Sequence, residues 1–421
     1  MNLNRIAIGI RVASSENYHP ALFLDFSNTS LSLDSRITFT RGSQATYFDS
    51  TGTLQTAGNN VARSNAFQDY NPSTLAPLGF LIEEQRTNLF LYSAQFDDAT
   101  WGKSNCTITA NSVTSPAGTT TADTLTITAA GGAMNQTTQT FTAGSTVTIT
   151  VFAKKNASNF MRVELGNLVN CWFNLNTGAT ATNSAGSGNV LFSAKSIQAI
   201  NNGWYRCSVT VTTSVLTTLA VLIYATDTDN NTSSINSSIY LWGAQAEVGV
   251  FATSYIATTT AAATRLADSA SITGTNFSNW FNATEGTFAI VGDYSYIATL
   301  APGLLKVADS GSDNNRMFLA ISAGTQRLSV VTAGVEVADI SRSGVVAGTV
   351  FKQAAAYKDN DFASCINAGT VGTDAIGAVP TGLVALYLSR DNTFNYPNGH
   401  IQRLSYYRTR LANATLQSLT A

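Results

Sequence analysis

Apolar and polar residues alternate over most of this chain, in short runs separated by residues typical of turns. In Thr146–Ala153, apolar side chains occupy every second position and threonines lie between them, with Phe152 as the exception. A two-residue period puts alternate side chains on opposite faces of a strand. Comparable runs recur at intervals of roughly ten residues, as in all-β domains. The chain is therefore predicted to be all-β.

Two series of such strands are separated by a stretch that lacks them. The runs from Leu89 to Ile256 are numerous enough for a two-sheet sandwich with jelly-roll connections, and a second series begins near Ser271. The first 88 residues hold only short strand-like pieces, too few for a core of their own. The predicted fold is thus a tandem of jelly-roll β-sandwiches behind a small N-terminal region of β and extended structure. The predicted units are an attachment region (1–88), a jelly roll (89–256), a linker (257–270) and a jelly roll (271–421).

Aromatic and aliphatic residues mark the strands expected to be interior. In Ile239–Ala244 the apolar residues occupy both alternating positions, which predicts a strand covered on both faces. The tryptophans in or beside apolar runs are interpreted as core residues: Trp101, Trp172, Trp204 and Trp242.

Composition narrows the classes of function. Charged residues make up 11% of the 421 positions, where about 25% is usual, so the surface must consist largely of uncharged polar residues. The net charge is −2 and no basic cluster is denser than Lys154–Lys155, which argues against nucleic-acid binding. No apolar run reaches the roughly 18 residues of a membrane span, and Ile6–Ile10 is too short for a secretion signal. We expect a protein that is neither exported nor inserted into a membrane.

Three blocks of sequence carry a resemblance to a known family. They are GFLIEEQRTNLFLYSAQFDDATW at Gly79–Trp101, WGAQAEVGVFATSYIAT followed by TRLADS from Trp242, and NGHIQRLSYYRTRLANATLQSLT at Asn398–Thr420. The chain resembles virion proteins of tailed bacteriophages of the head-fibre or tail-fibre type. This resemblance implies one carbohydrate-binding-module-like jelly roll and one concanavalin A-like (LamG-like) jelly roll, with no established catalytic residues.

The resemblance also implies a place and partners for the protein. It would be made in the host cytoplasm and reside on the virion surface, anchored to other virion proteins through its N-terminal region. From their weak alternation, we expect residues 1 to about 20 to be the anchor. Host-surface polysaccharide would be its ligand. A homotrimer is expected, because the weakly charged surface and open strand edges favour association. The alternatives are a capsid-decorating cement protein without glycan binding and a capsule depolymerase.

The residues give little support to catalysis or to a bound cofactor. The histidines, His19 and His400, are far apart in the sequence, and no nucleophile elbow, phosphate loop or zinc motif is present. We therefore expect no enzymatic activity and no cofactor. Asp227 and Asp229 are weak candidates for a calcium site, because the positions where an EF-type loop needs glycine and an acidic residue hold Thr232 and Ser238.

One loop near the C-terminus has the composition of a sugar-binding site. Aromatic rings stack on sugar rings, while carboxylates and amides bond to sugar hydroxyls. The stretch RDNTFNYPNGH combines these groups outside any alternating run. The predicted glycan-binding residues are Asp391, Asn392, Phe394, Asn395 and Tyr396. The competing interpretation is that both rings pack on the sandwich.

Overall fold

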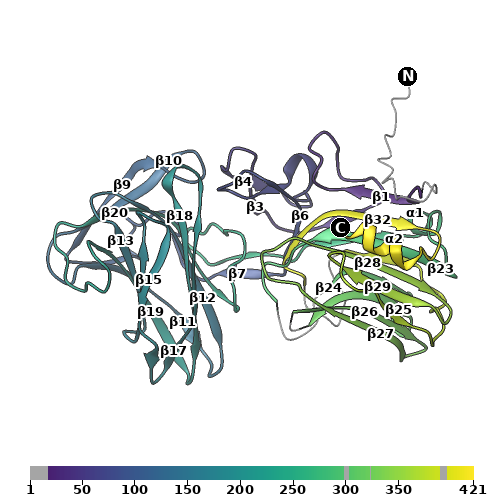
Figure 1. Cartoon of the computed structure of the whole chain (residues 1–421). Coiled ribbons are helices and arrows are strands. Elements are labelled where there is room, and N and C mark those ends of the chain that lie inside the picture. The colour runs from purple at the N-terminus through teal and green to yellow at the C-terminus, as the bar shows by residue number, and fades with distance from the viewer. Residues whose placement is uncertain (1–17, 298–302, 323, 389–395) are drawn as a thin grey trace.

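A computed structural model describes residues 18–297, 303–322, 324–388 and 396–421 (Figure 1). Strands dominate these residues and form two sandwiches, which confirms the all-β prediction. The helical elements in this part of the chain are α1 (Thr275–Ser278), α2 (Asn413–Leu419) and the 3-10 turns η1 (Asn65–Phe67) and η2 (Asn201–Gly203). Of the described helices, none has the length and apolar character needed to cross a bilayer.

The middle sandwich consists of two antiparallel sheets that enclose one core. The first sheet has the order β16 (Gly186–Ser187), β17 (Val190–Ala199), β18 (Tyr205–Thr213), β12 (Thr146–Lys155), β20 (Ser238–Val248), β10 (Thr120–Ile127) and β9 (Cys106–Thr114). The second has the order β15 (Ala179–Asn183), β14 (Val169–Asn174), β13 (Phe160–Leu165), β19 (Thr217–Thr226), β11 (Ala133–Phe141) and β8 (Gly102–Ser104).

Strand β12 shows why the alternating pattern specifies this sandwich. Val147, Ile149 and Val151 enter the core between the sheets, as the two-residue period predicts. Phe152 interrupts the pattern because the opposite face is also covered. Its ring contacts Trp242 and Tyr255, at centroid distances of 5.5 and 6.1 Å. The four tryptophans predicted as core residues are all buried.

The C-terminal sandwich also has two sheets around one core. One sheet runs β30 (Gly372–Asp374), β29 (Phe362–Ile366), β28 (Phe351–Lys358), β23 (Glu285–Gly292), β32 (Gly399–Tyr407), β6 (Pro77–Ile82) and β5 (Asp69–Tyr70), with β1 (Leu22–Asp25) also on β32. The other runs β2 (Thr38–Thr40), β22 (Ser269–Thr273), β31 (Ala385–Tyr387), β24 (Gly303–Ala308), β25 (Arg316–Ser322), β26 (Thr325–Thr332) and β27 (Val335–Ser343).

The N-terminal strands β1, β2, β5 and β6 belong to the C-terminal sandwich, so they do not form the separate region that the sequence suggested. Leu24 on β1 pairs with Leu404 on β32, and Phe80 on β6 pairs with Ile401 of the same strand. Strand β2 extends the opposite sheet through β22. These pieces are too short to enclose a core, so they bury their apolar side chains in a core formed by strands more than two hundred residues later.

A hairpin from the same N-terminal region packs on the middle sandwich. It consists of β3 (Ala45–Phe48) and β4 (Leu54–Ala57), joined by the predicted turn at Asp49–Gly52. Phe48 and Leu54 belong to an apolar cluster with aromatic residues of the middle sandwich. In Figure 1 the hairpin lies between the two sandwiches. The outer face of β12 and β20 is thereby covered.

The segment predicted as a linker forms part of the folded junction. Strand β21 (Ala263–Arg265) pairs with β7 (Arg86–Asn88), so the strands that lead into and out of the middle sandwich lie side by side. Arg265 and Asp268 are buried. The prediction of a linker was wrong because it rested on the lack of large apolar residues. This segment is held in place by buried charged residues instead.

Candidate functional site

A row of side chains crosses the outer face of the sheet that contains β24 to β27. Cross-strand pairing places Tyr387, Lys306, Phe318, Ser329 and Asp339 in successive register on β31, β24, β25, β26 and β27. The intervening residues of these strands point into the core of the sandwich. One face of the sheet is therefore free to carry polar chemistry while the other stabilises the fold.

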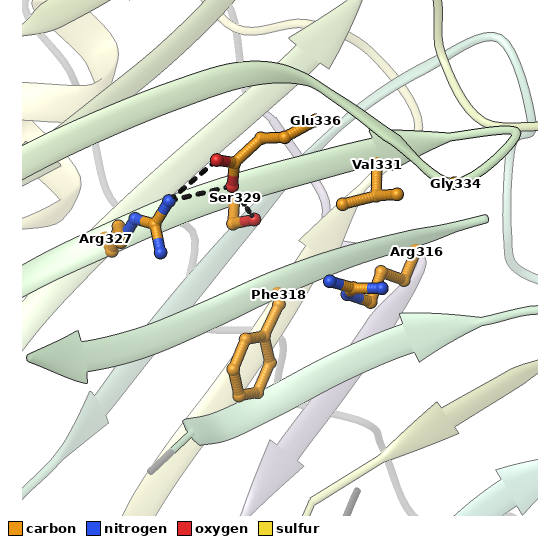
Figure 2. Close-up of a pocket in the computed structure, with 7 residues that line it drawn as sticks. All are labelled: Arg316, Phe318, Arg327, Ser329, Val331, Gly334 and Glu336. Carbon is orange, nitrogen blue, oxygen red and sulfur yellow. Dashed lines mark hydrogen bonds and ion pairs between the residues drawn. The ribbon is translucent and has the colours of Figure 1, made fainter. Parts of the chain in front are cut away.

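A pocket with a volume of about 260 Å³ opens on this face. The outer-face pocket is lined by Arg316, Phe318, Arg327, Ser329, Val331, Gly334 and Glu336 (Figure 2), which belong to β25, β26, the turn after β26 and the start of β27. Its size lies just below the usual range of small-molecule sites, so it suits one small group of a larger ligand.

Arg327 organises the polar side of the outer-face pocket. Its Nη2 donates to both carboxylate oxygens of Glu336, at 2.8 and 2.9 Å. Its Nε and Nη2 also donate to Asp339, at 2.8 and 2.9 Å. The hydrogen bond to Asp339 and the charge of Glu336 raise the pKa of Arg327 above its usual value. The Ser329 hydroxyl donates to Glu336 at 2.5 Å, which fixes the position of that carboxylate (Figure 2).

The rest of the row combines a buried cation with an aromatic ring. Lys306 is 5% exposed. Its Nζ donates to Asp313 at 2.7 Å and lies 5.2 Å from the ring centroid of Tyr387. The charges on this face are thus held by partners within the protein, and the pocket keeps a defined shape.

The predicted glycan-binding loop is described only in part. Phe394, Asp391, Asn392 and Asn395 lie outside the described residues. Tyr396 is half-buried and packs against the core of the C-terminal sandwich.

The residues of the outer-face pocket were not predicted from the sequence. Phe318, Arg327, Ser329 and Glu336 lie in runs interpreted only as strands, and Arg316 directly precedes one of them. A signal was present, because Arg327 and Ser329 are polar residues at alternate positions of β26, opposite the apolar Leu328 and Val330. Their partner Glu336 becomes visible only once the hairpin between β26 and β27 is known.

The two weak metal candidates are engaged in loop contacts. The Asp227 carboxylate accepts hydrogen bonds from the hydroxyls of Ser158 and Ser237, at 2.9 and 2.7 Å. Asp229 accepts from the backbone N–H and hydroxyl of Thr182. Within the described ranges, no group of three or more histidine, cysteine, aspartate or glutamate side chains is arranged to hold a metal ion.

A second cluster of charges is buried at the junction of the two sandwiches. Arg63 pairs with Glu83 and Asp268, each at 2.6 Å, and Arg41 reaches Asp268 at 3.0 Å. Glu83 also accepts from the N–H and hydroxyl of Ser254, at 2.7 and 2.6 Å. Burial alone would raise the pKa of Glu83, but the nearby arginines, including Arg265, lower it well below the usual range. We name these residues the junction cluster and assign it a structural role.

Several residues of the junction cluster come from two of the sequence blocks that carry the family resemblance. Glu83 comes from the first block, while Ser254, Arg265 and Asp268 come from the second. The adjacent Glu84 pairs with Arg86 instead.

His400 lies in a third buried cluster. Its Nδ1 contacts the carboxylate of Asp293 at 3.1 Å and its Nε2 contacts Asp69 at 3.2 Å. Burial alone would lower the pKa of His400, but Asp293 and Asp69 outweigh it and raise this pKa to about 10. His400 is therefore a charged bridge between β32 and β5 at neutral pH.

The His400 bridge predicts a loss of stability in alkali. A histidine whose pKa is raised by folding stabilises the protein fully below its unfolded value of about 6.5, and this contribution disappears as the pH rises through about 10. We expect the melting temperature to fall more between pH 7 and pH 10 in the parent protein than in His400→Gln, which starts lower. His19→Gln, at an exposed position, is the control and should match the parent. Parallel curves for His400→Gln and the parent would contradict this assignment.

Comparisons with known proteins give only partial similarities. No protein-family model and no curated protein matches the chain. Among solved structures, the CBM40 of the Ruminococcus gnavus IT-sialidase bound to α2,3-sialyllactose aligns with a TM-score of 0.30 and 20% identity, over 33% of this chain and 84% of that one. NanB sialidase from Streptococcus pneumoniae aligns with a TM-score of 0.31 and 14% identity, over 35% of this chain and 26% of that one.

A third solved structure, from work on how botulinum neurotoxin type C enters cells, aligns with a TM-score of 0.29 and 14% identity. It covers 37% of this chain and 40% of that one. Because all three TM-scores are near 0.3, we base the function on the outer-face pocket and on the sequence.

Proposed function

We propose that this protein is a structural component of the surface of a tailed-bacteriophage virion and binds host-surface glycan through the outer-face pocket. The observation that carries the binding role is the pocket itself, where Arg327, Ser329 and Glu336 present fixed polar groups beside Phe318 and Val331. Sugars need fixed polar groups of this kind, because their hydroxyls form directed hydrogen bonds.

The virion role rests on the resemblance of the sequence blocks. The blocks at Gly79–Trp101 and Asn398–Thr420 meet in the fold, since Phe80 pairs with Ile401 and Asn398 Oδ1 accepts the N–H of Glu84 at 2.9 Å. Attachment through the N-terminal region and a homotrimeric assembly are parts of the same proposal. Electron microscopy of virions labelled with an antibody against this chain tests it: label on fibres or on the capsid surface supports it, and unlabelled virions refute it.

We propose binding without cleavage. A glycosidase needs one carboxyl group that is protonated to act as an acid and a second that is ionised. Glu336 and Asp339 both accept hydrogen bonds from the same guanidinium, that of Arg327. This arrangement suits two acceptors rather than an acid and a base. Incubation with host polysaccharide should leave its chain length unchanged, whereas shortened chains would favour a depolymerase.

The outer-face pocket predicts the effect of a single substitution. We expect Glu336→Ala to weaken glycan binding about tenfold, because a hydrogen bond to a charged group contributes about 1.5 kcal/mol or more. Glu336 has a 40% exposed side chain, so the melting temperature should stay close to that of the parent. Binding is measured by titration calorimetry or by retention on immobilised polysaccharide.

The matched control for this prediction is Glu285→Ala. Glu285 is a partly exposed carboxylate on the other sheet of the same sandwich, 3.7 Å from Lys358. The Glu285→Ala substitution should leave glycan binding unchanged. Equal binding by Glu336→Ala and the parent protein would rule out the outer-face pocket as the glycan site. A cement protein would bind no glycan in any variant.

A further inference from the structure

We propose that the outer-face pocket selects neutral sugars and discriminates against acidic ones. This inference rests on the proposed glycan-binding function and adds the chemical class of the ligand. It follows from how the charged groups of the pocket are already paired and from which of their atoms remain accessible.

Two guanidinium groups line the pocket and could attract an acidic sugar, and both already donate within the protein: Arg316 to the backbone oxygen of Asp313 at 2.5 Å, and Arg327 to carboxylates. Arg327 makes two hydrogen bonds to Glu336 and two to Asp339, all between 2.8 and 2.9 Å. A carboxylate or phosphate on the ligand would have to displace one of these partners. The displaced carboxylate would then lie beside the ligand's negative charge, and like charges in contact are unfavourable.

The carboxylates are more accessible than the cation that holds them. The side chains of Glu336 and Asp339 are 40% and 42% exposed, whereas that of Arg327 is 29% exposed. Each carboxylate has about four acceptor positions, and only part of these are filled by Arg327 and Ser329. A ligand therefore meets hydrogen-bond acceptors first, and neutral sugars supply hydroxyl donors for them.

The charge balance of the outer-face pocket leads to the same ligand class. Arg316, Arg327 and the neighbouring Lys306 bring three positive charges, and Glu336 with the neighbouring Asp339 and Asp313 brings three negative charges. The site as a whole offers no excess of positive charge to bind an anion. Specificity then comes from directed hydrogen bonds to the exposed oxygens of Glu336 and Asp339, while Phe318 and Val331, which are only 6% and 3% exposed, close the base of the pocket.

The test is an array of oligosaccharides in which every acidic probe is paired with its carboxyl-reduced, neutral form. We expect the parent protein to bind at least one neutral probe and to bind its acidic partner at least tenfold more weakly. The double variant Glu336→Gln, Asp339→Asn leaves Arg327 without a carboxylate. It should shift the preference at least tenfold toward the acidic form, and added salt should reduce that shift.

The outcomes distinguish a failure of the proposed selectivity from a failure of the proposed glycan-binding function. Tighter binding of acidic probes by the parent, with loss of binding in Glu336→Ala, would overturn the selectivity and leave glycan binding at the pocket standing. Binding to none of the probes, neutral or acidic, would overturn both. Should the double variant fail to fold, the single variant Glu336→Gln replaces it, and an unchanged preference for neutral probes in that folded variant would contradict the inference.

Discussion

A fragment of residues 271–421, the unit that the sequence suggests as an independent domain, is expected to show no cooperative thermal transition. It lacks β1 and β6, which both pair with β32 on the side away from β23, and β2, which extends β22. The lost strands and the residue after β1 supply five fully buried side chains to the core, Leu22, Leu24, Phe26, Phe80 and Ile82. At about 1.5–3 kcal/mol each, their loss is comparable with the whole stability of a typical domain, about 5–15 kcal/mol.

A matched shortened chain keeps these strands and omits the middle sandwich. Asn88 and Ala263 are cross-strand partners on β7 and β21, so a two-residue Asn-Gly turn can join them as a hairpin. We expect residues 18–88 joined in this way to 263–421 to unfold cooperatively, as measured by circular dichroism on heating. A cooperative transition of the 271–421 fragment at the temperature of the full chain would show that the N-terminal strands are dispensable.

Substitution of Asp268 by Asn is expected to destabilise the protein by about 3–5 kcal/mol, the cost of breaking a buried ion pair from one side. Asp268 accepts hydrogen bonds from Arg41, Arg63 and the backbone N–H of Glu83. Loss of its charge would leave two fully buried guanidinium groups without their shared partner. Urea unfolding monitored by tryptophan fluorescence measures the change, since Trp204 and Trp242 are buried on the middle sandwich near the hairpin.

The control for Asp268→Asn is Asp34→Asn. The Asp34 to Arg36 pair is also a carboxylate with a guanidinium, but both side chains are 29% exposed. Exposed pairs contribute between about 0 and 1 kcal/mol. If both variants lose the same small amount of stability, then the junction cluster does not hold the sandwiches together.

The strands were predictable because their pattern is local. Val147, Ile149 and Val151 on β12 alternate with threonines, and this suffices to predict a buried face. Turn residues marked the hairpins in the same way, as at Asp49–Gly52. Strand partners were not predictable, because Leu22–Asp25 carries no local sign that it pairs with Arg403–Tyr406. Without those partners, the first 88 residues look like a separate region.

The junction cluster and the outer-face pocket could not be predicted from the sequence for a related reason. Arg63, Glu83 and Asp268 are each unremarkable in the sequence, and they form a cluster only when three distant segments meet. The prediction of a site favoured a loop rich in asparagine because polar residues in loops are easy to recognise. Polar residues on the outer face of a strand, such as Arg327 and Ser329, look the same as ordinary solvent-facing residues until their partners are in place.

The most direct test of the proposed function is a crystal structure of the protein with the oligosaccharide that it binds most tightly. We expect sugar density in the outer-face pocket, with ligand hydroxyls within hydrogen-bonding distance of Glu336 and Asp339. Sugar bound at any other place on the chain, such as the loop that contains Phe394, with the outer-face pocket empty in the same crystal, would contradict it.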